Sequence, residues 1–274
     1  MKNKSLHIYA IVVAVATFLL IIAGGLVTST GSGLSVPDWP LSFGQFFPKM
    51  EGGVLFEHGH RLIAGTVGGM TVVLAVWIWL TEIRRELRVL AAFAVGVVCL
   101  QGLLGGLTVL LKLPPSVSVA HACLGQIFFS INVCLAVLTG LQARLPLHPV
   151  VTPTVKKLQR LAMMTTTFVF LQLLAGAILR HSGWGLHLHL TGAVLVTIHI
   201  LLVAKRVFKE YADVPELHQP ALWMSWLLGL QLALGFVSWR VGGVAVTTAH
   251  GGVGALIFAA SVVFTMQSYR RLAA

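Results

Sequence analysis

Charged residues are scarce in this sequence: they make up 10% of its 274 residues, whereas 57% are hydrophobic. A water-soluble domain needs roughly a quarter of its residues charged to cover its surface. This composition therefore excludes an ordinary soluble protein, and the mean hydropathy of +0.90 agrees. Since a transmembrane helix needs about 20 apolar residues, we expect a multi-pass membrane protein.

Acidic residues are scarcer still, with 8 Asp and Glu against 19 Lys and Arg, a formal net charge of +11. In a soluble protein this excess would suggest nucleic acid binding. Here the basic residues flank apolar runs, which is typical of topology anchors and of contacts with anionic membrane lipid. We therefore expect membrane lipid, and no nucleic acid, among the partners.

Cysteine is nearly absent. Cys99, Cys123 and Cys134 lie inside apolar segments and lack the spacing of metal ligands. Because an odd number within such segments does not indicate a disulfide framework, we interpret all three as small hydrophobic residues of the core.

Eight apolar runs are separated by polar connections. They lie at about 7–28, 57–80, 89–111, 118–142, 159–179, 186–204, 221–239 and 244–268. The first run is too long for a signal peptide and lacks a clear cleavage site, which favours an uncleaved helix. Most Lys and Arg residues fall in connections on one side, so the positive-inside rule predicts both termini in the cytoplasm and the long 29–56 segment outside. Short loops and few charges are typical of a bacterial inner membrane protein.

The second half of the chain repeats the first. LQGLLGGL at 100–107 resembles LQLALGFV at 230–237, and VAHACLG at 119–125 resembles TAHGGVG at 248–254. His60 and His189 are 129 positions apart, as are His121 and His250. We therefore predict an all-α integral membrane fold of eight transmembrane helices, built as two parallel-repeat four-helix bundles, residues 1–145 and 146–274.

These four histidines are the main functional signal. Each is predicted near the outer end of an inward-running helix, and ionisable residues inside spans tend to mark function. Two facing imidazoles in a helical bundle suit heme iron. A closed zinc site would need four ligands in one cluster, and no thiolate or methionine cluster suggests copper. We predict heme-iron ligands at His60, His121, His189 and His250.

The two halves differ in the acidic residue next to the histidines. Glu57 lies one helical turn before His60, whereas Leu186 occupies the matching place in the second half. A carboxylate beside only one site suggests proton handling or charge stabilisation there, although a carboxylate near a helix N-terminus is also favoured by the helix dipole alone. Arg61 has three candidate partners: a heme propionate, Glu57 or a lipid headgroup.

Five segments resemble motifs of heme A synthases. They are EHGHR at 57–61, AHACLGQ at 120–126, HLH before TGA at 187–193, TAH at 248–250 and GGLVTSTGSGLSVPDWPLSFG at 24–44. The resemblance runs through essentially the whole chain in order. It implies eight helices in two halves and a membrane-bound oxidoreductase that converts heme O to heme A, oxidising a porphyrin methyl to a formyl group by successive hydroxylations.

The resemblance also implies residue roles. His60 and His121 would hold the substrate heme, Glu57 would be catalytic, and His189 and His250 would ligate a resident heme b. It further implies heme O as substrate, an unidentified electron donor, and proximity to the heme O synthase and to factors of terminal oxidase assembly.

The chain departs from the family pattern at several positions. Many relatives carry a cysteine pair in the first outer loop, where this chain has Ser35 and Ser42, and Leu190 replaces the family's arginine after the third histidine. His187 competes with His189 as ligand, and the shared 129-residue offset favours His189. Further supporting candidates are Arg61, Arg180 and His187. We expect Arg180 to lie on the short second outer loop, beside His181.

Other functions remain open at this point. A di-heme b-type electron-transfer cytochrome would use the same four ligands, but two equivalent carriers would not need one acid. A transporter would fit the parallel repeat, yet the spans lack broken helices and intramembrane acid pairs. A structural assembly subunit would give no reason for four matched histidines.

Overall fold

The computed structural model describes residues 2–140, 150–151 and 154–273. Within these ranges the chain forms eight long helices and one pair of short strands. The helices are α1 (Lys2–Ser29), α2 (Gly53–Thr81), α3 (Arg85–Leu110), α4 (Pro115–Thr139), α5 (Val155–Ser182), α6 (Leu186–Glu210), α7 (Pro215–Arg240) and α8 (Val244–Arg271). The strands, β1 (Val150–Val151) and β2 (Leu272–Ala273), pair in parallel over two residues and were not predicted.

Each helix is long and apolar enough to cross a membrane. The shortest has 25 residues, and a rise of about 1.5 Å per residue carries it across a hydrocarbon core about 30 Å thick. The helices begin and end at recognisable signals: α4 and α7 start at prolines, whose missing N–H is not needed in a first turn. The predicted all-α, eight-span membrane fold is confirmed.

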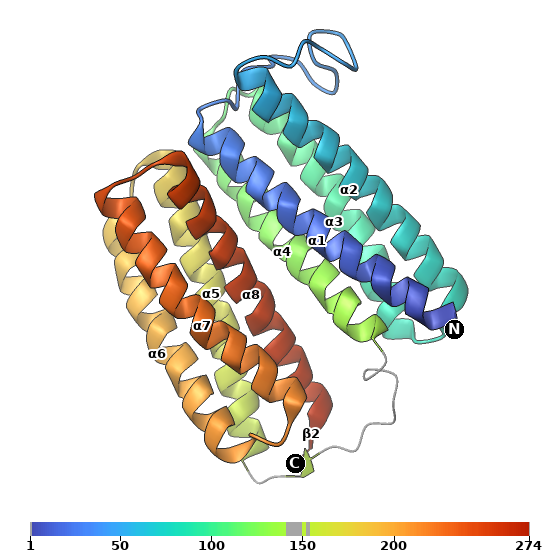
Figure 1. The fold of residues 1–274 in the computed structure, drawn as a ribbon, viewed down its shortest axis with the longest axis vertical. Coiled ribbons are helices and arrows are strands. Elements are labelled where there is room, and N and C mark those ends of the chain that lie inside the picture. The colour runs from blue at the N-terminus through green and yellow to red at the C-terminus, as the bar shows by residue number, and fades with distance from the viewer. Residues whose placement is uncertain (1, 141–149, 152–153, 274) are drawn as a thin grey trace.

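The helices form two four-helix bundles, α1–α4 and α5–α8, that lie side by side (Figure 1). One hydrophobic core lies within α1–α4, and another is built mainly from α5–α8. The bundles meet along α1, α4, α5 and α8, where Phe129 of α4 packs against Ala255 and Ala259 of α8. The predicted division at 145/146 lies outside the described residues and stays a prediction.

The α1–α2 connection, residues 30–52, forms a long loop at one end of the first bundle, opposite the end where both termini lie (Figure 1). The matching α5–α6 connection has only three residues, 183–185. Gly183 ends α5 because it takes a left-handed conformation at φ 72°, which glycine adopts at little cost. Arg180 and His181 therefore belong to the last turn of α5, and their predicted place on the connecting loop is wrong.

The cysteines are free, as expected. Cys123 and Cys134 are buried in α4, which confirms their interpretation as core residues. Cys99 is exposed on α3, so its placement in the core was wrong. Apolar composition alone does not separate a core-facing position from one that faces lipid, because both favour hydrophobic residues.

Candidate functional site

The four predicted ligands lie near the N-terminal ends of the even-numbered helices, at the end of the bundles that carries the long loop. Each imidazole contacts a glycine on the preceding helix. A Cβ built on any of these glycines would lie 3.0–3.2 Å from the ring Cε1 atom, closer than an ordinary van der Waals contact. The pairs are Gly24 with His60, Gly105 with His121, Gly176 with His189 and Gly235 with His250.

In the second bundle the two imidazoles face each other. The ring centroids of His189 and His250 are 6.1 Å apart, and their planes are inclined by 76°. A metal–imidazole bond is about 2 Å long, so two imidazoles on opposite sides of one iron have ring centres roughly 6 Å apart. The separation fits a bis-histidine heme. His187 is exposed and instead meets Trp184 edge-on, at 6.2 Å between ring centroids.

In the first bundle, His60 of α2 and His121 of α4 occupy the places that correspond to His189 and His250. Their Nδ1 atoms are buried without a hydrogen-bond partner in the described part of the chain, as is that of His250. A buried polar atom without a partner costs about 1–3 kcal/mol. A metal-bound imidazole uses both ring nitrogens, one on the metal and one on a hydrogen-bond acceptor, so both histidine pairs fit a heme group.

A closed zinc centre receives no support. Among the residues that the structure describes, no three His, Cys, Asp or Glu side chains come together as a metal-binding group. The histidines form two separate pairs, which suits a macrocycle that already supplies four nitrogen ligands to its iron.

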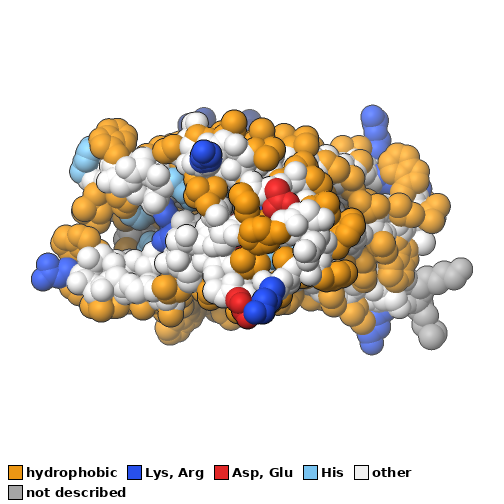
Figure 2. Space-filling view, turned by 90° about the horizontal axis from the view of Figure 1, so that it is seen from above, with side chains coloured by type: hydrophobic (Ala, Val, Ile, Leu, Met, Phe, Trp, Pro, Cys, Tyr) orange, Lys and Arg blue, Asp and Glu red, His pale blue; other side chains and the backbone are white. Residues whose placement is uncertain are grey.

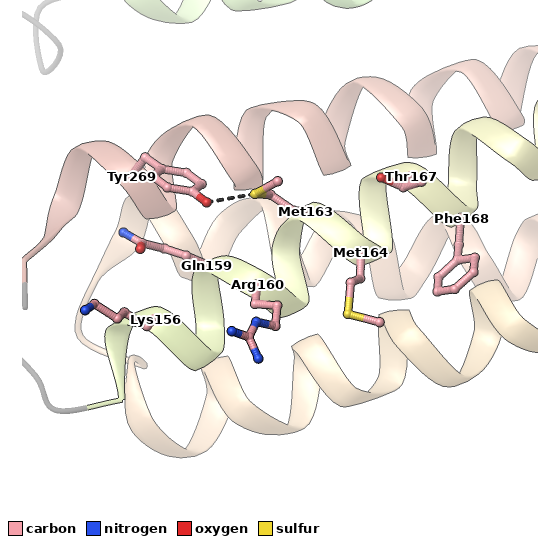
Figure 3. Close-up of a pocket in the computed structure, with 8 residues that line it drawn as sticks. All are labelled: Lys156, Gln159, Arg160, Met163, Met164, Thr167, Phe168 and Tyr269. Carbon is pink, nitrogen blue, oxygen red and sulfur yellow. Dashed lines mark hydrogen bonds between the residues drawn. The ribbon is translucent and has the colours of Figure 1, made fainter.

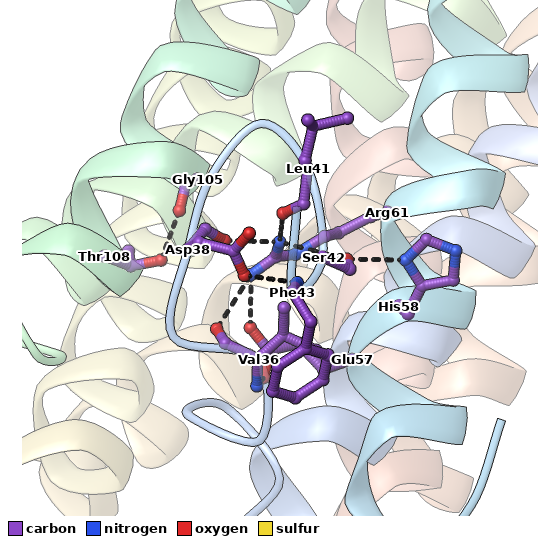
Figure 4. A network of polar contacts seen from close by, with 10 residues as sticks. All are labelled: Val36, Asp38, Leu41, Ser42, Phe43, Glu57, His58, Arg61, Gly105 and Thr108. Carbon is purple, nitrogen blue, oxygen red and sulfur yellow. Dashed lines mark hydrogen bonds and ion pairs between the residues drawn. The ribbon is translucent and has the colours of Figure 1, made fainter. Parts of the chain in front are cut away.

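Glu57, one helical turn before His60 in the sequence, contacts the long loop (Figure 4). Its side chain is only 5% exposed. One carboxylate oxygen accepts the backbone N–H of Val36 at 2.8 Å, and the other accepts an Arg61 N–H at 2.6 Å. A buried carboxylate needs such partners, because an unpaired buried charge is strongly destabilising. Glu57 is therefore ordered and charge-balanced.

Arg61 holds the loop as well as Glu57. Its guanidinium donates to the backbone carbonyls of Val36, Asp38 and Leu41, at 3.1, 2.7 and 2.9 Å. Of the three partners considered from the sequence, the structure shows Glu57, and it adds loop carbonyls that the sequence did not suggest. A planar guanidinium can do this because its donors form a rigid fork.

Two further contacts fix the loop, and sequence reasoning missed both. Ser42 and His58 are buried and bond to each other at 2.7 Å between the hydroxyl and Nδ1. The ring of Trp39 packs on Gly106 of α3, where a Cβ would lie 2.8 Å from it. The repeated His-x-His pattern at 58–60 and 187–189 was a usable signal for His58, whereas nothing in the sequence indicated the partner of Trp39.

The tip of the loop is ordered by Asp38. Its carboxylate accepts the backbone N–H groups of Gly44 and Phe43, at 2.8 and 2.7 Å. These two hydrogen bonds hold the pKa of Asp38 below its ordinary value. The loop thus covers the end of the first bundle as a hydrogen-bonded unit.

The second bundle is more open at this end. Seen from the loop end, the surface is hollowed beside the loop, and histidine and basic side chains line the hollow (Figure 2). Arg180, exposed in the last turn of α5, donates to the hydroxyl of Ser29 at 2.5 Å, and Ser29 bonds Thr248 of α8 at 2.9 Å. Arg180 therefore ties the two bundles together beside the histidines.

A groove of about 470 Å³ lies at the opposite end of α5, far from the histidines (Figure 3). Its walls include Lys156, Arg160, Met164, Phe168 and Tyr269. It takes no part in the candidate site.

Two helical bundles, each with a pair of inward-facing histidines, define a multi-pass membrane protein suited to hold heme. Comparison with known families agrees. The family model described as cytochrome oxidase assembly protein (COX15-CtaA) matches residues 7–190. The match covers more than half of the chain, so this protein belongs to that family, which implies a heme-related cofactor.

The chain is similar to several curated proteins named heme A synthase. It is 28% identical over 183 residues to the one from Alkalihalophilus pseudofirmus, covering 66% of this chain and 61% of that protein. The relative from Bacillus pumilus is 26% identical over 266 residues, with 85% of each chain covered. A third, from Shouchella clausii, is 38% identical over 110 residues, which cover 38% of this chain and 35% of that protein.

Proposed function

We propose that this protein is a heme A synthase, a membrane-bound oxidoreductase that oxidises a methyl group of heme O to a formyl group by successive hydroxylations. The observation that carries the proposal is the asymmetry of two otherwise matched histidine pairs. Only the first pair has a buried acid one turn away and a closed loop above it. The family membership and the similarity to heme A synthases support the same function.

We infer that residues 1–145 hold the substrate, with His60 and His121 on the iron of heme O. Residues 146–274 hold a resident heme b through His189 and His250, which the 6.1 Å separation of their rings supports. When bound, the resident heme supplies one-electron transfer between an external donor and the substrate site.

Glu57 is the proposed catalytic residue. Its carboxylate either stabilises positive charge that develops at the oxidised methyl or accepts a proton from water. Arg61 holds the carboxylate in position through their 2.6 Å ion pair. The loop that both residues hold limits water at the reacting carbon, which strengthens electrostatic interactions there.

Two departures from the family pattern bear on the loop. With Ser35 and Ser42 in place of a cysteine pair, a thiol step or a disulfide at these positions is unavailable. The hydroxyl of Ser42 instead anchors the loop to His58. Leu190 stands in place of an arginine, and the basic residues at this end of the second bundle include Arg180 and Arg240, in the last turns of α5 and α7.

The proposed setting is the cytoplasmic membrane of a bacterium, with both termini in the cytoplasm. The distribution of Lys and Arg supports this orientation. The partners proposed are heme O, an unidentified electron donor, membrane lipid, the heme O synthase and terminal oxidase assembly factors. The basic residues are assigned to lipid and topology, not to nucleic acid.

The first test is chromatography of hemes extracted from the protein after co-expression with a heme O source. We expect heme A or a hydroxylated intermediate from the wild type. Glu57→Gln should accumulate heme O, while Glu51→Gln, which alters an exposed carboxylate paired with Lys49 on the same loop, should behave as wild type. Unmodified heme b alone, at two per chain in every variant, would identify an electron-transfer cytochrome.

A second pair of variants separates catalysis by Glu57 from its role in holding the loop. Arg61→Gln removes the contacts of the guanidinium with the loop, while the carboxylate of Glu57 keeps its hydrogen bond from the backbone N–H of Val36. If Glu57 acts chemically, Glu57→Gln should reduce the rate far more than Arg61→Gln, since general acid–base groups contribute about 10²–10⁴-fold. Equal losses in both variants would assign Glu57 a structural role only.

A further inference from the structure

Three of the four histidines each contact a glutamine on the preceding helix. In the first two pairs, the glutamine side-chain N–H donates to the backbone carbonyl of the histidine at 2.9 Å. In the third, the glutamine amide nitrogen lies 3.4 Å from the imidazole Nε2. The pairs are Gln101 with His121, Gln172 with His189 and Gln231 with His250.

Each glutamine stands four residues before the glycine that the imidazole contacts, in the pattern Gln-x-x-x-Gly. It also lies over a second glycine, one turn after its histidine. A Cβ on Gly125 or Gly254 would lie 3.1 or 3.3 Å from the glutamine amide nitrogen, and one on Gly192 only 2.1 Å from the amide oxygen. A side chain at these positions would therefore press on the glutamine, and the chain has glycine there in all three cases.

His60 lacks this arrangement. Leu20 stands four residues before Gly24, where the other helices have glutamine, and Ala64 stands one turn after His60, where they have glycine. Leu20 packs against the hydrophobic core of the first bundle. Since its side chain has no hydrogen-bonding atom, it cannot orient an imidazole as an amide can.

Hydrogen-bond acceptors on the glutamines and possible donors on the histidines are both left without partners. The side-chain oxygens of Gln101, Gln172 and Gln231 are buried without a partner in the described ranges, as is Nδ1 of His121 and of His250. A metal-bound histidine almost always donates its second ring N–H to an oxygen acceptor, which fixes the ring and strengthens the ligand. The glutamine amide nitrogen lies 3.1 Å from Nδ1 of His189 and 3.4 Å from Nε2 of His250, so a rotation of the amide brings its oxygen to a ring N–H.

We propose that Gln101, Gln172 and Gln231 are positioning residues that hold three imidazoles as permanent heme ligands, and that His60 is the exchangeable ligand. The idea rests on the proposed function, in which one heme must leave as product and the other must stay. In the second bundle, glutamines then position both heme ligands. In the first bundle, a glutamine positions His121 only, and His60 releases the substrate heme.

The test measures heme release from the purified chain, loaded with hemin in detergent, to an excess of apomyoglobin. Wild type should release one heme quickly and one slowly. The double variant Gln231→Leu, Gly254→Ala copies the Leu20–Ala64 arrangement into the second bundle. It should accelerate the slow phase by about 10–100-fold, the usual effect of losing such a partner. It should also raise the midpoint potential of that heme, because an imidazole without an acceptor is a weaker electron donor.

The reverse variant, Leu20→Gln with Ala64→Gly, should slow the fast phase, a gain that a misfolded protein cannot imitate. Gln159→Leu is the matched control: this α5 glutamine also donates to a carbonyl on another helix, Ser268 at 3.3 Å, but at the far end of the bundle. It should change neither phase. Equal release from both sites in wild type, or unchanged rates in both double variants, would overturn the proposal.

This experiment needs no turnover, so its failure is distinct from failure of the proposed function. Two-phase release that responds to the variants, in a protein that never converts heme O, would retain the positioning role and reject the synthase. Conversion of heme O with release rates indifferent to the glutamines would do the opposite.

Discussion

Replacing Gly235 by alanine should loosen the heme in the second bundle. The added Cβ would lie 3.0 Å from Cε1 of His250, so the imidazole must move away from α7. His250 is seated between that helix and His189, whose ring centroid is 6.1 Å away. A displacement of a few tenths of an ångström therefore changes the geometry at the iron directly.

The magnitude follows from the cost of overpacking. Inserting a methyl group into a packed site typically costs about 1–3 kcal/mol, and about 1.4 kcal/mol corresponds to a factor of ten in an equilibrium constant. If the cost falls mainly on the bound state, the affinity for heme should drop by about 5–150-fold. We expect substoichiometric heme in the second site and faster transfer to apomyoglobin.

The same helix offers the control. A Cβ on Gly229 would meet nothing within 4 Å, so Gly229→Ala should keep full heme content and gain slightly in helix propensity. The assay is the pyridine hemochrome spectrum per mole of purified protein. Full heme content with an unchanged spectrum and transfer rate in Gly235→Ala would refute the idea that glycine seats the imidazole.

Two further predictions concern the long loop. Gly106→Ala should displace Trp39, whose ring would lie 2.8 Å from the new Cβ. The displacement should open the first site to water and slow heme A formation. Gly102→Ala is the control and should not slow it, because a Cβ there would meet nothing within 4 Å. The pKa of Asp38 is lower in the folded protein than in the unfolded chain. Its ionised carboxylate therefore stabilises the loop tip at pH values above the unfolded pKa, and this stabilisation is lost as the pH falls through the folded pKa. The protection of the two amides it binds, measured as the exchange rate relative to the intrinsic rate at the same pH, should therefore fall in acid in wild type. Asp38→Asn should already have low protection at neutral pH, and equal protection in both at neutral pH would contradict this reasoning.

The spans could be predicted because their signal is local. A run of about 20 apolar residues leaves the backbone no option in lipid but to satisfy its own hydrogen bonds as a helix. The pairing of His189 with His250 was also predicted from sequence, because the predicted topology placed both near the outer ends of inward-running helices, at similar membrane depth. The 129-residue offset from His60 favoured His189 over His187, and the structure brings His189 to His250.

What the sequence left open depends on contacts between distant residues. Composition did not show that Cys99 faces outward or that α5 continues through Arg180 and His181. The partners of Arg61 are carbonyls of a loop 20–25 residues earlier, and no residue type marks a carbonyl as an acceptor in advance.

By itself, the sequence determined eight apolar helices, the internal repeat and the four histidines, since each depends on spacing along one segment or on a fixed offset between two. Only the tertiary structure decided which glycine seats each imidazole, which glutamines reach a histidine and how Glu57 is held. These depend on how neighbouring helices rotate and approach, and packing of the whole bundle sets that approach to within a few tenths of an ångström.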